Sequence, residues 1–255
     1  KESSAASDVY KRQVCEKSQG EVYIDGKRYN KKDLKIKQNI GYIAEENRFL
    51  LGKTLLENAK MFGSFYDQFD IEYFKELLCK YNLEEDKTPE QLSKGMKIKF
   101  QLAFVLANHP KLLLLDEPTG GLDPLFRQEF LNILQGLVEE ENMGVIISTH
   151  ITTDLDKVAD YIMILDKGKI ISLTTKEELM DEYRLIKGSR EILRRLPMEL
   201  FISVKSTNTG FEGLAQRSKK IIGQEELLHK IVIENPDLSD ILYYLSKEKS
   251  TLDEK

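Results

Sequence analysis

The sequence predicts an α/β fold with a parallel sheet at its centre. Leu112–Leu115 is a run of four leucines without a polar face, and Val145–Thr149 is a second short apolar run. Such runs are typical of strands buried on both sides within a parallel sheet. Around them, apolar residues recur at three- and four-residue steps over 54–81, 96–107 and 124–141, which predicts helices.

Composition restricts the classes of protein. The chain has 255 residues, 41% hydrophobic and 32% charged, so it is globular, with room for one large domain or two modest ones. The net charge of -5 comes without a basic stripe, so we expect no nucleic-acid partner. Cys15 and Cys79 form no ligand cluster, which favours a reducing compartment such as the cytoplasm. No apolar run approaches the roughly 20 residues of a membrane span.

The first part of the chain carries few signals. Residues 1–13 lack periodicity, and we expect them to be a non-native leader. Gly20–Lys27 has the pattern of a strand followed by a turn, and Ile40–Ile43 that of a strand. The helical pattern over 54–81 follows and is interpreted as core and partner-docking surface.

Two helix starts carry polar caps. Ser93 precedes the amphipathic run 96–107, which stops before Pro110, so Ser93 is predicted to be an N-cap. Asp123 followed by Pro124 has the form of an N-cap with proline at the first helical position. A helix start offers free amide hydrogens and a positive dipole, which suit a phosphate. A plain capped helix explains Ser93 equally well.

Two carboxylates follow the leucine run directly. Ligands in open α/β sheets bind beyond the carboxyl ends of the strands, so Asp116 and Glu117 are predicted to lie at the mouth of a site. Asp116 can hold Mg²⁺, and Glu117 can polarise an attacking water. The alternative is that the two acids cap a turn. His150 ends the strand 145–149, where the alternative to a catalytic role is a structural hydrogen bond.

Together these stretches resemble the nucleotide-binding domain of ABC transporters, of the bacterial Gram-positive type. Four motifs occur in the family's order. They are Leu92–Met96 for the signature, Leu112–Glu117 for the Walker B strand and its glutamate, Gly121–Asp123 for the D-loop, and Ser148–His150 for the switch histidine. Ala44–Asn47 stands at the glutamine loop, with Glu45 in place of Gln; a carboxylate cannot donate the hydrogen bond of an amide. Lys94 and Met96 replace a Gly and the Gln of the common signature.

The resemblance implies an ATPase with ATP and Mg²⁺ as ligands. Asp116 and Glu45 are expected at the metal, and Glu117 and His150 in catalysis. Ser93, Gly95, Asp123 and Glu45 are expected to contact the nucleotide. The resemblance also implies a head-to-tail dimer of two ATPase subunits and a separate transmembrane permease subunit. The chain would then be cytoplasmic and peripheral on the inner face of the membrane.

A phosphate loop is not found in the sequence. Gly52-Lys53-Thr54 has the ending of one, but Gly-x-x-x-x-Gly-Lys-Thr requires glycine at position 47, where this chain has Asn47. We therefore expect a P-loop NTPase-like core whose first strands and Walker A segment are missing. Two alternatives to a transport ATPase remain: a non-transport ABC ATPase, and an inactive fragment.

The expected organisation has three parts. The leader 1–13 is followed by an ABC ATPase domain over 14–182, with a helical subdomain at about 48–108. The region 183–255 is expected to be a small α/β accessory domain. Its expected strands are 184–187, 200–205 and 228–233, its expected helices are 190–195 and 237–244, and its expected frayed tail is 246–255. A short helix around 155–159 and a hairpin over 161–171 connect it to the strand that ends at His150.

Overall fold

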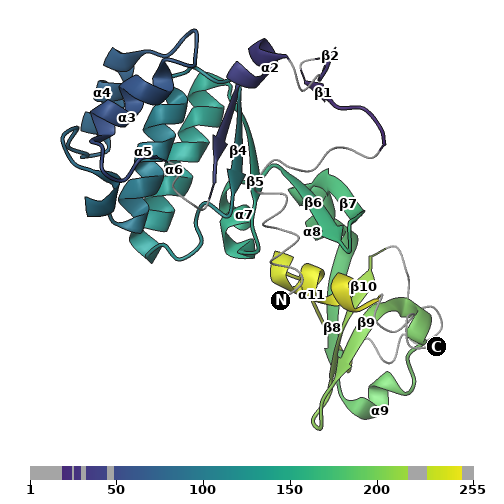
Figure 1. Cartoon of the computed structure of the whole chain (residues 1–255). Helices are drawn as coiled ribbons and strands as arrows, with labels where there is room; N and C mark the ends of the chain where they lie inside the picture. The colour runs from purple at the N-terminus through teal and green to yellow at the C-terminus, as the bar shows by residue number, and fades with distance from the viewer. Residues whose placement is uncertain (1–18, 25, 30–32, 45–48, 218–228, 249–255) are drawn as a thin grey trace. The chain divides into compact units, whose positions relative to one another are not determined.

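The computed structural model describes residues 19–24, 26–29, 33–44, 49–217 and 229–248 (Figure 1). The chain divides into two compact units, one ending at His150 and the other beginning at Ile151. The expected leader 1–13 lies outside the described residues, and so does Glu45.

A three-stranded parallel sheet forms the centre of the first unit, as the sequence predicts. Its order is β3 (Ile40–Ile43), β4 (Leu112–Asp116), β5 (Gly144–Ser148). In this register Leu113 lies opposite both Gly41 and Val145. β4 is therefore the middle strand, but its leucines are not buried on both sides as predicted: Leu113 and Leu115 are buried, whereas Leu112 and Leu114 are half-buried.

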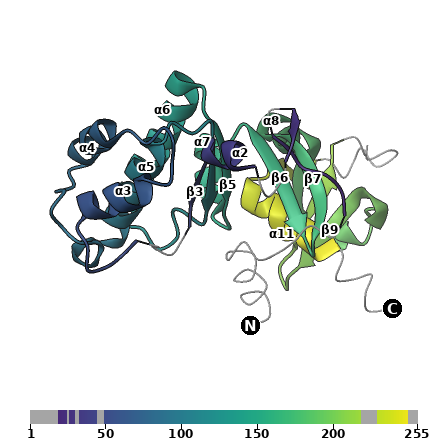
Figure 2. The ribbon, with the colours of Figure 1, turned by 45° about the horizontal axis from the view of Figure 1, so that its top comes forward.

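One face of this sheet is covered by α5 (Lys94–Leu106) and α6 (Pro124–Glu141), which lie on the same side of it in Figures 1 and 2. Leu113 and Leu115 are buried on this face. Gly41 is required here, because a Cβ at this position would lie 2.1 Å from Cγ1 of Val105 on α5. The absent side chain lets the helix approach the strand closely.

The opposite face is more open than the sequence predicts. Val145–Thr149 is expected to be a strand buried on both sides, but β5 alternates between exposed and half-buried residues. The side chain of Ile146 is 58% exposed. The prediction of two-sided burial is wrong for β5 in the described structure, because only Val145 and Ile147 face the helices and the side chains on the other face remain exposed.

The helical segment of the first unit contains two helices rather than one continuous run. α3 (Leu55–Gly63) and α4 (Ile71–Lys80) are separated by 64–70, and the short η1 (Pro89–Gln91) precedes α5. The break is explained by Asp70, whose side chain accepts hydrogen bonds from the backbone N–H groups of Glu72 and Tyr73 and so starts a new helix.

Aromatic side chains fill the space between these helices. The ring of Phe49 lies 4.4 Å from that of Phe100 and 5.0 Å from that of Phe104, measured between centroids. Phe69 contacts Phe104 in the same way at 5.0 Å. This cluster joins α3, α4 and α5 into one core with the leucines of β4.

The first unit begins with small elements. β1 (Tyr23–Ile24) and β2 (Lys27–Arg28) form an antiparallel pair, with Gly26 in the left-handed region between them. α2 (Leu34–Gln38) follows and leads directly into β3. The expected strand and turn over Gly20–Lys27 is thus a minimal hairpin.

The second unit is an antiparallel sheet with a hairpin and helices. It begins with α7 (Thr152–Val158), the expected hairpin of β6 (Tyr161–Asp166) and β7 (Lys169–Thr175), and α8 (Lys176–Glu182). The remaining elements are β8 (Tyr183–Gly188), α9 (Arg190–Leu193), η2 (Met198–Leu200), β9 (Phe201–Ser206), β10 (Phe211–Gln216), β11 (Val232–Glu234) and α11 (Leu238–Glu248). The order of the four-stranded sheet is β11-β8-β10-β9.

Three sequence expectations in this unit differ from the structure. β10 is not predicted by the sequence, because Phe211–Gln216 contains a glycine and two polar residues and does not alternate clearly. The strand expected over 228–233 is β11, which starts only at Val232 and ends at Glu234. The tail expected to fray from Ser246 is helical as far as Glu248, since α11 continues to that residue.

The hairpin belongs to the core of the second unit. Ile162 and Ile164 of β6 are buried together with Tyr183, Leu185 and residues of α11. Tyr244 of α11 is buried in this core, and its hydroxyl donates a hydrogen bond to the Glu212 carboxylate at 2.8 Å. The boundary between compact units accordingly lies at 150/151, upstream of the 182/183 position expected from composition.

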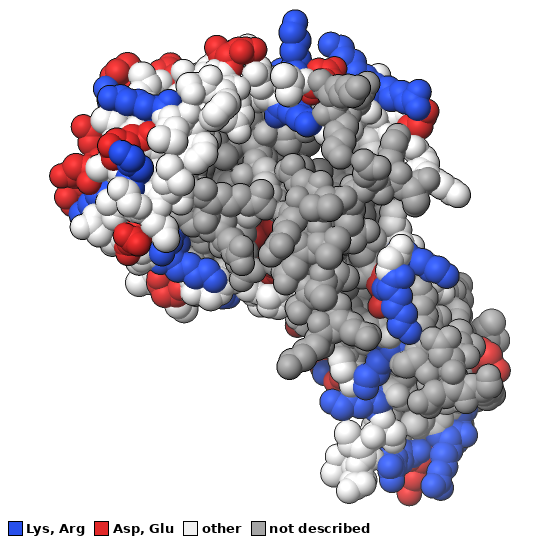
Figure 3. Space-filling model, viewed as in Figure 1, with Lys and Arg blue, Asp and Glu red and all other residues white. Residues whose placement is uncertain are grey.

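Charged side chains cover the surface unevenly. Figure 3 shows acidic and basic residues interspersed over the outer helices of the first unit, whereas Lys and Arg predominate on the visible face of the second. Arg190, Arg194 and Arg195 are exposed on and just after α9. None of the helices in the described part of the chain combines the length and the apolar character needed to cross a membrane.

Asn58 is expected to be essential for the stability of the first unit. It is fully buried on α3, accepts a hydrogen bond from the Leu50 backbone N–H, and donates to the carbonyls of Leu50, Lys53 and Thr54. Asn58→Ala should lower the free energy of unfolding by about 2 kcal/mol or more, because the hydrogen bonds of a fully buried amide are lost. Urea denaturation measures this. Asn132→Ala, at an exposed position of α6, is the control and should change stability by less than about 0.5 kcal/mol.

Ending the chain after Asp181 should make the protein aggregate. The truncation removes Tyr183, Leu185 and Tyr244, so the buried face of Ile162 and Ile164 becomes exposed. Size-exclusion chromatography checks the outcome. A matched truncation that removes only 249–255 keeps this core and should remain monodisperse. If the protein ending at Asp181 is equally monodisperse, the hairpin does not depend on the later sheet.

Candidate functional site

The carboxyl edge of the parallel sheet gathers three of the predicted site residues. Asp116 ends β4 and lies opposite Ser148, the last residue of β5. The Glu117 backbone N–H donates to the Ser148 carbonyl at 2.8 Å. Because β4 and β5 are parallel, both chains leave the sheet at the same edge, and His150 emerges next to the two acids.

Glu117 has an unusual backbone conformation. Its φ of 49° lies in the left-handed region, which a residue with a side chain adopts at a cost. Its carbonyl accepts a hydrogen bond from the Gly120 N–H, which starts the turn towards the D-loop. Strained residues of this kind are concentrated at functional sites. The sequence gives no local signal for this conformation.

The side chains of Glu117 and His150 meet at this edge. The Glu117 Oε2 atom lies 2.8 Å from the His150 Nδ1 atom. Oε2 is buried and makes no hydrogen bond in the described structure, so its contact with Nδ1 is electrostatic, an ion pair when the imidazole is protonated. The Glu117 side chain is 24% exposed and the His150 side chain 77% exposed. The carboxylate therefore has an unused lone pair next to an imidazole that solvent and ligands can reach.

The carboxylates at the carboxyl edge of the sheet fit Mg²⁺ only if a bound phosphate completes its coordination. No group of three or more His, Cys, Asp or Glu side chains that could hold a metal is found in the described residues. Mg²⁺ typically binds through one or two carboxylates, several waters and substrate phosphates. Asp116, with Glu117 beside it, provides a set of this size, so the residues present fit a metal that arrives with a phosphate.

The signature residues lie at the start of α5. The Ser93 hydroxyl oxygen accepts a hydrogen bond from the Met96 N–H at 3.2 Å, as the N-cap prediction requires. Gly95 is buried against the ring of Phe126, where an added Cβ would lie 2.9 Å from Cδ1. The amine of Lys94 is 3.1 Å from the Cβ position of Gly121. The signature and the D-loop are thus direct neighbours in this chain.

Asp123 joins the same neighbourhood from the D-loop. Its carboxylate accepts a hydrogen bond from the Phe126 N–H at 3.0 Å and caps α6. Further along the two helices, Lys99 forms an ion pair with Glu129 at 2.8 Å, and Lys99 is almost fully buried. These contacts hold the starts of α5 and α6 together.

The segment Gly52-Lys53-Thr54, which has the ending of a phosphate loop, starts α3 in the structure. The Thr54 side chain accepts from the Glu57 N–H, and Glu57 accepts in return from the Thr54 N–H, so the pair forms a capping box for α3. Lys53 pairs with Glu57 at 3.2 Å. The groups that would hold a phosphate are engaged in starting a helix.

Sequence reasoning missed that four large apolar side chains on and beside α3 are exposed. They are Leu50, Leu51, Met61 and Phe65. The helical pattern over 54–81 assigned its apolar stripe to core and docking surface without separating the two. The structure separates core residues from surface residues within α3: Leu55 and Ala59 are buried, whereas Met61 is exposed.

Comparison with known proteins identifies the family. A family model described as ABC transporter matches residues 11–120. The chain is 36% identical over 160 residues to the lantibiotic transport ATP-binding protein SrtF of Streptococcus pyogenes, an alignment that covers 62% of this chain and 68% of SrtF. The chain belongs to the ABC transporter ATP-binding proteins. Members of this family bind nucleotide and hydrolyse ATP.

Other members give consistent matches. The ABC transporter ATP-binding protein YtrB of Bacillus subtilis (strain 168) is 31% identical over 171 residues, covering 67% of this chain and 58% of YtrB. The chain thus spans less than two thirds of that relative's length. The ATP-binding cassette MJ0796, solved as a dimer in a post-hydrolysis state with ADP and Pi, has 25% identity and a TM-score of 0.57, covering 68% of this chain and 80% of that one.

Gly95→Ala should destabilise the first unit. Alanine normally stabilises a helix relative to glycine, but here its methyl group would overlap the Phe126 ring, so we expect a loss of about 1–3 kcal/mol in unfolding free energy. Chemical denaturation measures the change. Gly136→Ala on α6 has open space around the new methyl group and should stabilise by about 0.5–1 kcal/mol. Adding Phe126→Leu should recover part of the loss, and a stabilised Gly95→Ala protein would contradict this packing.

Proposed function

We propose that the chain is an ATP-binding and ATP-hydrolysing subunit that powers a membrane ABC transporter. The observation that carries the proposal is the contact of Glu117 with His150 at the carboxyl edge of the sheet, in a chain that belongs to this family. A carboxylate with a free lone pair can polarise a water, and a neighbouring imidazole can donate to a phosphate oxygen. Hydrolysis of a phosphoanhydride requires both actions at one place.

The roles of the acids follow from their positions. Asp116 ends β4 and holds Mg²⁺, and Glu117 acts on the attacking water with its unpartnered Oε2. His150 is exposed and binds the γ-phosphate as charge develops on it. When bound, Mg²⁺ neutralises charge on the phosphate oxygens. Glu45 lies outside the described residues, and its proposed contact with metal and nucleotide rests on the family resemblance alone.

A second ATPase subunit is the first proposed partner, and the signature residues 92–96 are proposed to face it. Ser93 and Gly95 begin a helix whose first amides suit a phosphate, and Asp123 lies on the neighbouring D-loop. The cassette MJ0796 has been solved as a dimer. We infer a head-to-tail dimer in which Ser93 and Gly95 contact the nucleotide held by the other subunit, with Lys94 adding positive charge.

A transmembrane permease subunit is the second proposed partner. The side chains of Leu50, Leu51, Met61 and Phe65, on and beside α3, are apolar and exposed. Exposed apolar surface on this segment supports the proposal of a protein interface. The relatives SrtF and YtrB are named as transport and transporter ATP-binding proteins. The proposed location is therefore cytoplasmic, on the inner face of the membrane through the permease.

The main alternative is that this polypeptide is inactive. No stretch of the 255 residues has the form Gly-x-x-x-x-Gly-Lys-Ser/Thr, and the similar segment at Gly52 caps a helix. A phosphate loop supplies successive backbone N–H donors and a lysine to the phosphates. A non-transport ABC ATPase is the other alternative, and the transport names of the relatives favour the proposal over it.

Glu117→Gln should abolish hydrolysis in a protein able to bind ATP. A strand and phosphate loop of the family form are placed before residue 14, and ATP turnover is measured with Mg²⁺. Glutamine keeps the size of the side chain but loses its charge, so the rate should fall by about 10²- to 10⁴-fold while ATP-bound dimers accumulate. Glu140→Gln, on the exposed end of α6, is the matched control and should leave the rate unchanged.

Titration of the chain with ATP separates an active ATPase from an inactive polypeptide. Without the added segment, calorimetric titration should detect little or no ATP binding. Micromolar affinity of the chain as it stands would mean that another segment replaces the phosphate loop. An unchanged rate in the Glu117→Gln protein would exclude the proposed role of Glu117.

A further inference from the structure

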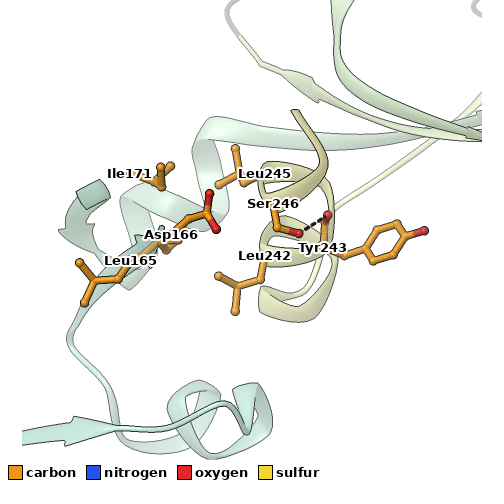
Figure 4. Close-up of a pocket in the computed structure, with 8 residues that line it drawn as sticks. Leu165, Asp166, Ile171, Leu242, Tyr243, Leu245 and Ser246 are labelled. Atoms are coloured by element: carbon orange, nitrogen blue, oxygen red, sulfur yellow. Dashed lines mark hydrogen bonds between the residues drawn. The ribbon is translucent and has the colours of Figure 1, made fainter. Parts of the chain in front are cut away.

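A half-open cavity of about 290 Å³ lies in the second unit, between the β6–β7 hairpin and α11 (Figure 4). Its wall is mostly aliphatic and includes Ile171, Leu242 and Leu245. None of its lining residues belongs to a nucleotide motif, so the proposed ATPase role does not use it.

Asp166 provides a carboxylate in this apolar wall. It ends β6, and Figure 4 shows its carboxylate directed across the cavity towards α11. Its Oδ2 atom is buried and has no hydrogen-bond partner in the described structure. A carboxylate oxygen removed from water without a partner is unfavourable, and a cation or a hydrogen-bond donor in the cavity would compensate.

The other polar group of the cavity is also an acceptor. The Ser246 hydroxyl donates to the Tyr243 carbonyl at 2.9 Å, so its oxygen remains free to accept a hydrogen bond. The Tyr243 ring points away from the cavity in Figure 4, and its hydroxyl accepts from Lys247 at 2.6 Å. The cavity therefore offers acceptors and aliphatic surface and needs a donor that carries positive charge.

Two simple occupants fit less well. Ca²⁺ and Mg²⁺ take six or more oxygen ligands, and Asp166 is the one carboxylate among the lining residues. Buried waters usually make about three hydrogen bonds, and the aliphatic surface of Leu242 and Leu245 offers them none. A ligand with a cationic donor at one end and a hydrocarbon body satisfies both parts of the wall.

We propose that this cavity binds a small aliphatic amine in its protonated form. The ammonium group donates to Asp166 Oδ2 and to the Ser246 hydroxyl oxygen, and the hydrocarbon body packs against Ile171, Leu242 and Leu245. Charge-assisted hydrogen bonds fix the ammonium end. The site goes beyond the proposed ATPase function, because it lies within the second unit and requires no nucleotide.

Titration of the full chain with n-pentylammonium tests the proposal, with 1-pentanol as the neutral ligand of the same length. Binding is followed by calorimetry and by NMR shifts of the α11 backbone. We expect saturable one-site binding of the amine with a dissociation constant of about 1 mM, in keeping with so few ligand atoms. The alcohol should bind at least tenfold more weakly.

Asp166→Asn should weaken amine binding at least tenfold without weakening alcohol binding, because it removes the charge and keeps the shape. The matched control is Asp160→Asn, an exposed position of the same unit, which should bind the amine as the unchanged chain does. Equal affinity for amine and alcohol, or equal loss in the two Asn variants, overturns the proposal. If Asp166→Asn does not fold, Leu242→Phe fills the cavity from α11 while keeping the carboxylate, and amine binding that survives it overturns the proposal.

Discussion

The parallel pairing of β4 with β5 is the constraint on which the candidate site depends. It aligns Asp116 with Ser148, and the hydrogen bond from the Glu117 N–H to the Ser148 carbonyl extends the pairing one residue past the strand. That extra bond helps to hold Glu117 in its left-handed conformation, from which its carboxylate reaches His150. The geometry of the proposed catalytic pair is thus set mainly by backbone pairing, and the packed leucines of β4 stabilise it.

A second group of contacts joins the elements expected to face another subunit. Gly95 lies against Phe126, Lys94 against Gly121, and Lys99 is paired with Glu129. The starts of α5 and α6 are consequently packed as one body. A displacement of the start of α5 would disturb the start of α6, because the buried Gly95 packs against Phe126 and the nearly buried Lys99 pairs with Glu129.

Local chemistry made part of this structure predictable. The leucines of β4, the caps Ser93 and Asp123, and the hairpin turn are each determined by neighbours a few residues away. The exposure of Ile146 depends on which elements cover β5, and the membership of the hairpin in the second core depends on residues far along the chain, such as Tyr244. Neither the cover over β5 nor the packing of the hairpin produces a pattern in the neighbouring sequence. The site residues were found by motif order, but the φ of Glu117 and the unpartnered Oε2 emerge only in three dimensions.

The position of β5 has a practical consequence for handling the protein. In the described part of the chain β5 is paired along one side, towards β4, and its other side presents backbone N–H and C=O groups beside the exposed Ile146. A flat strand edge with aliphatic side chains is a template on which a second molecule can add its own strand. Molecules in which this edge is left uncovered should therefore associate through intermolecular β-sheet at high concentration, and a lysine placed on the edge would oppose that association.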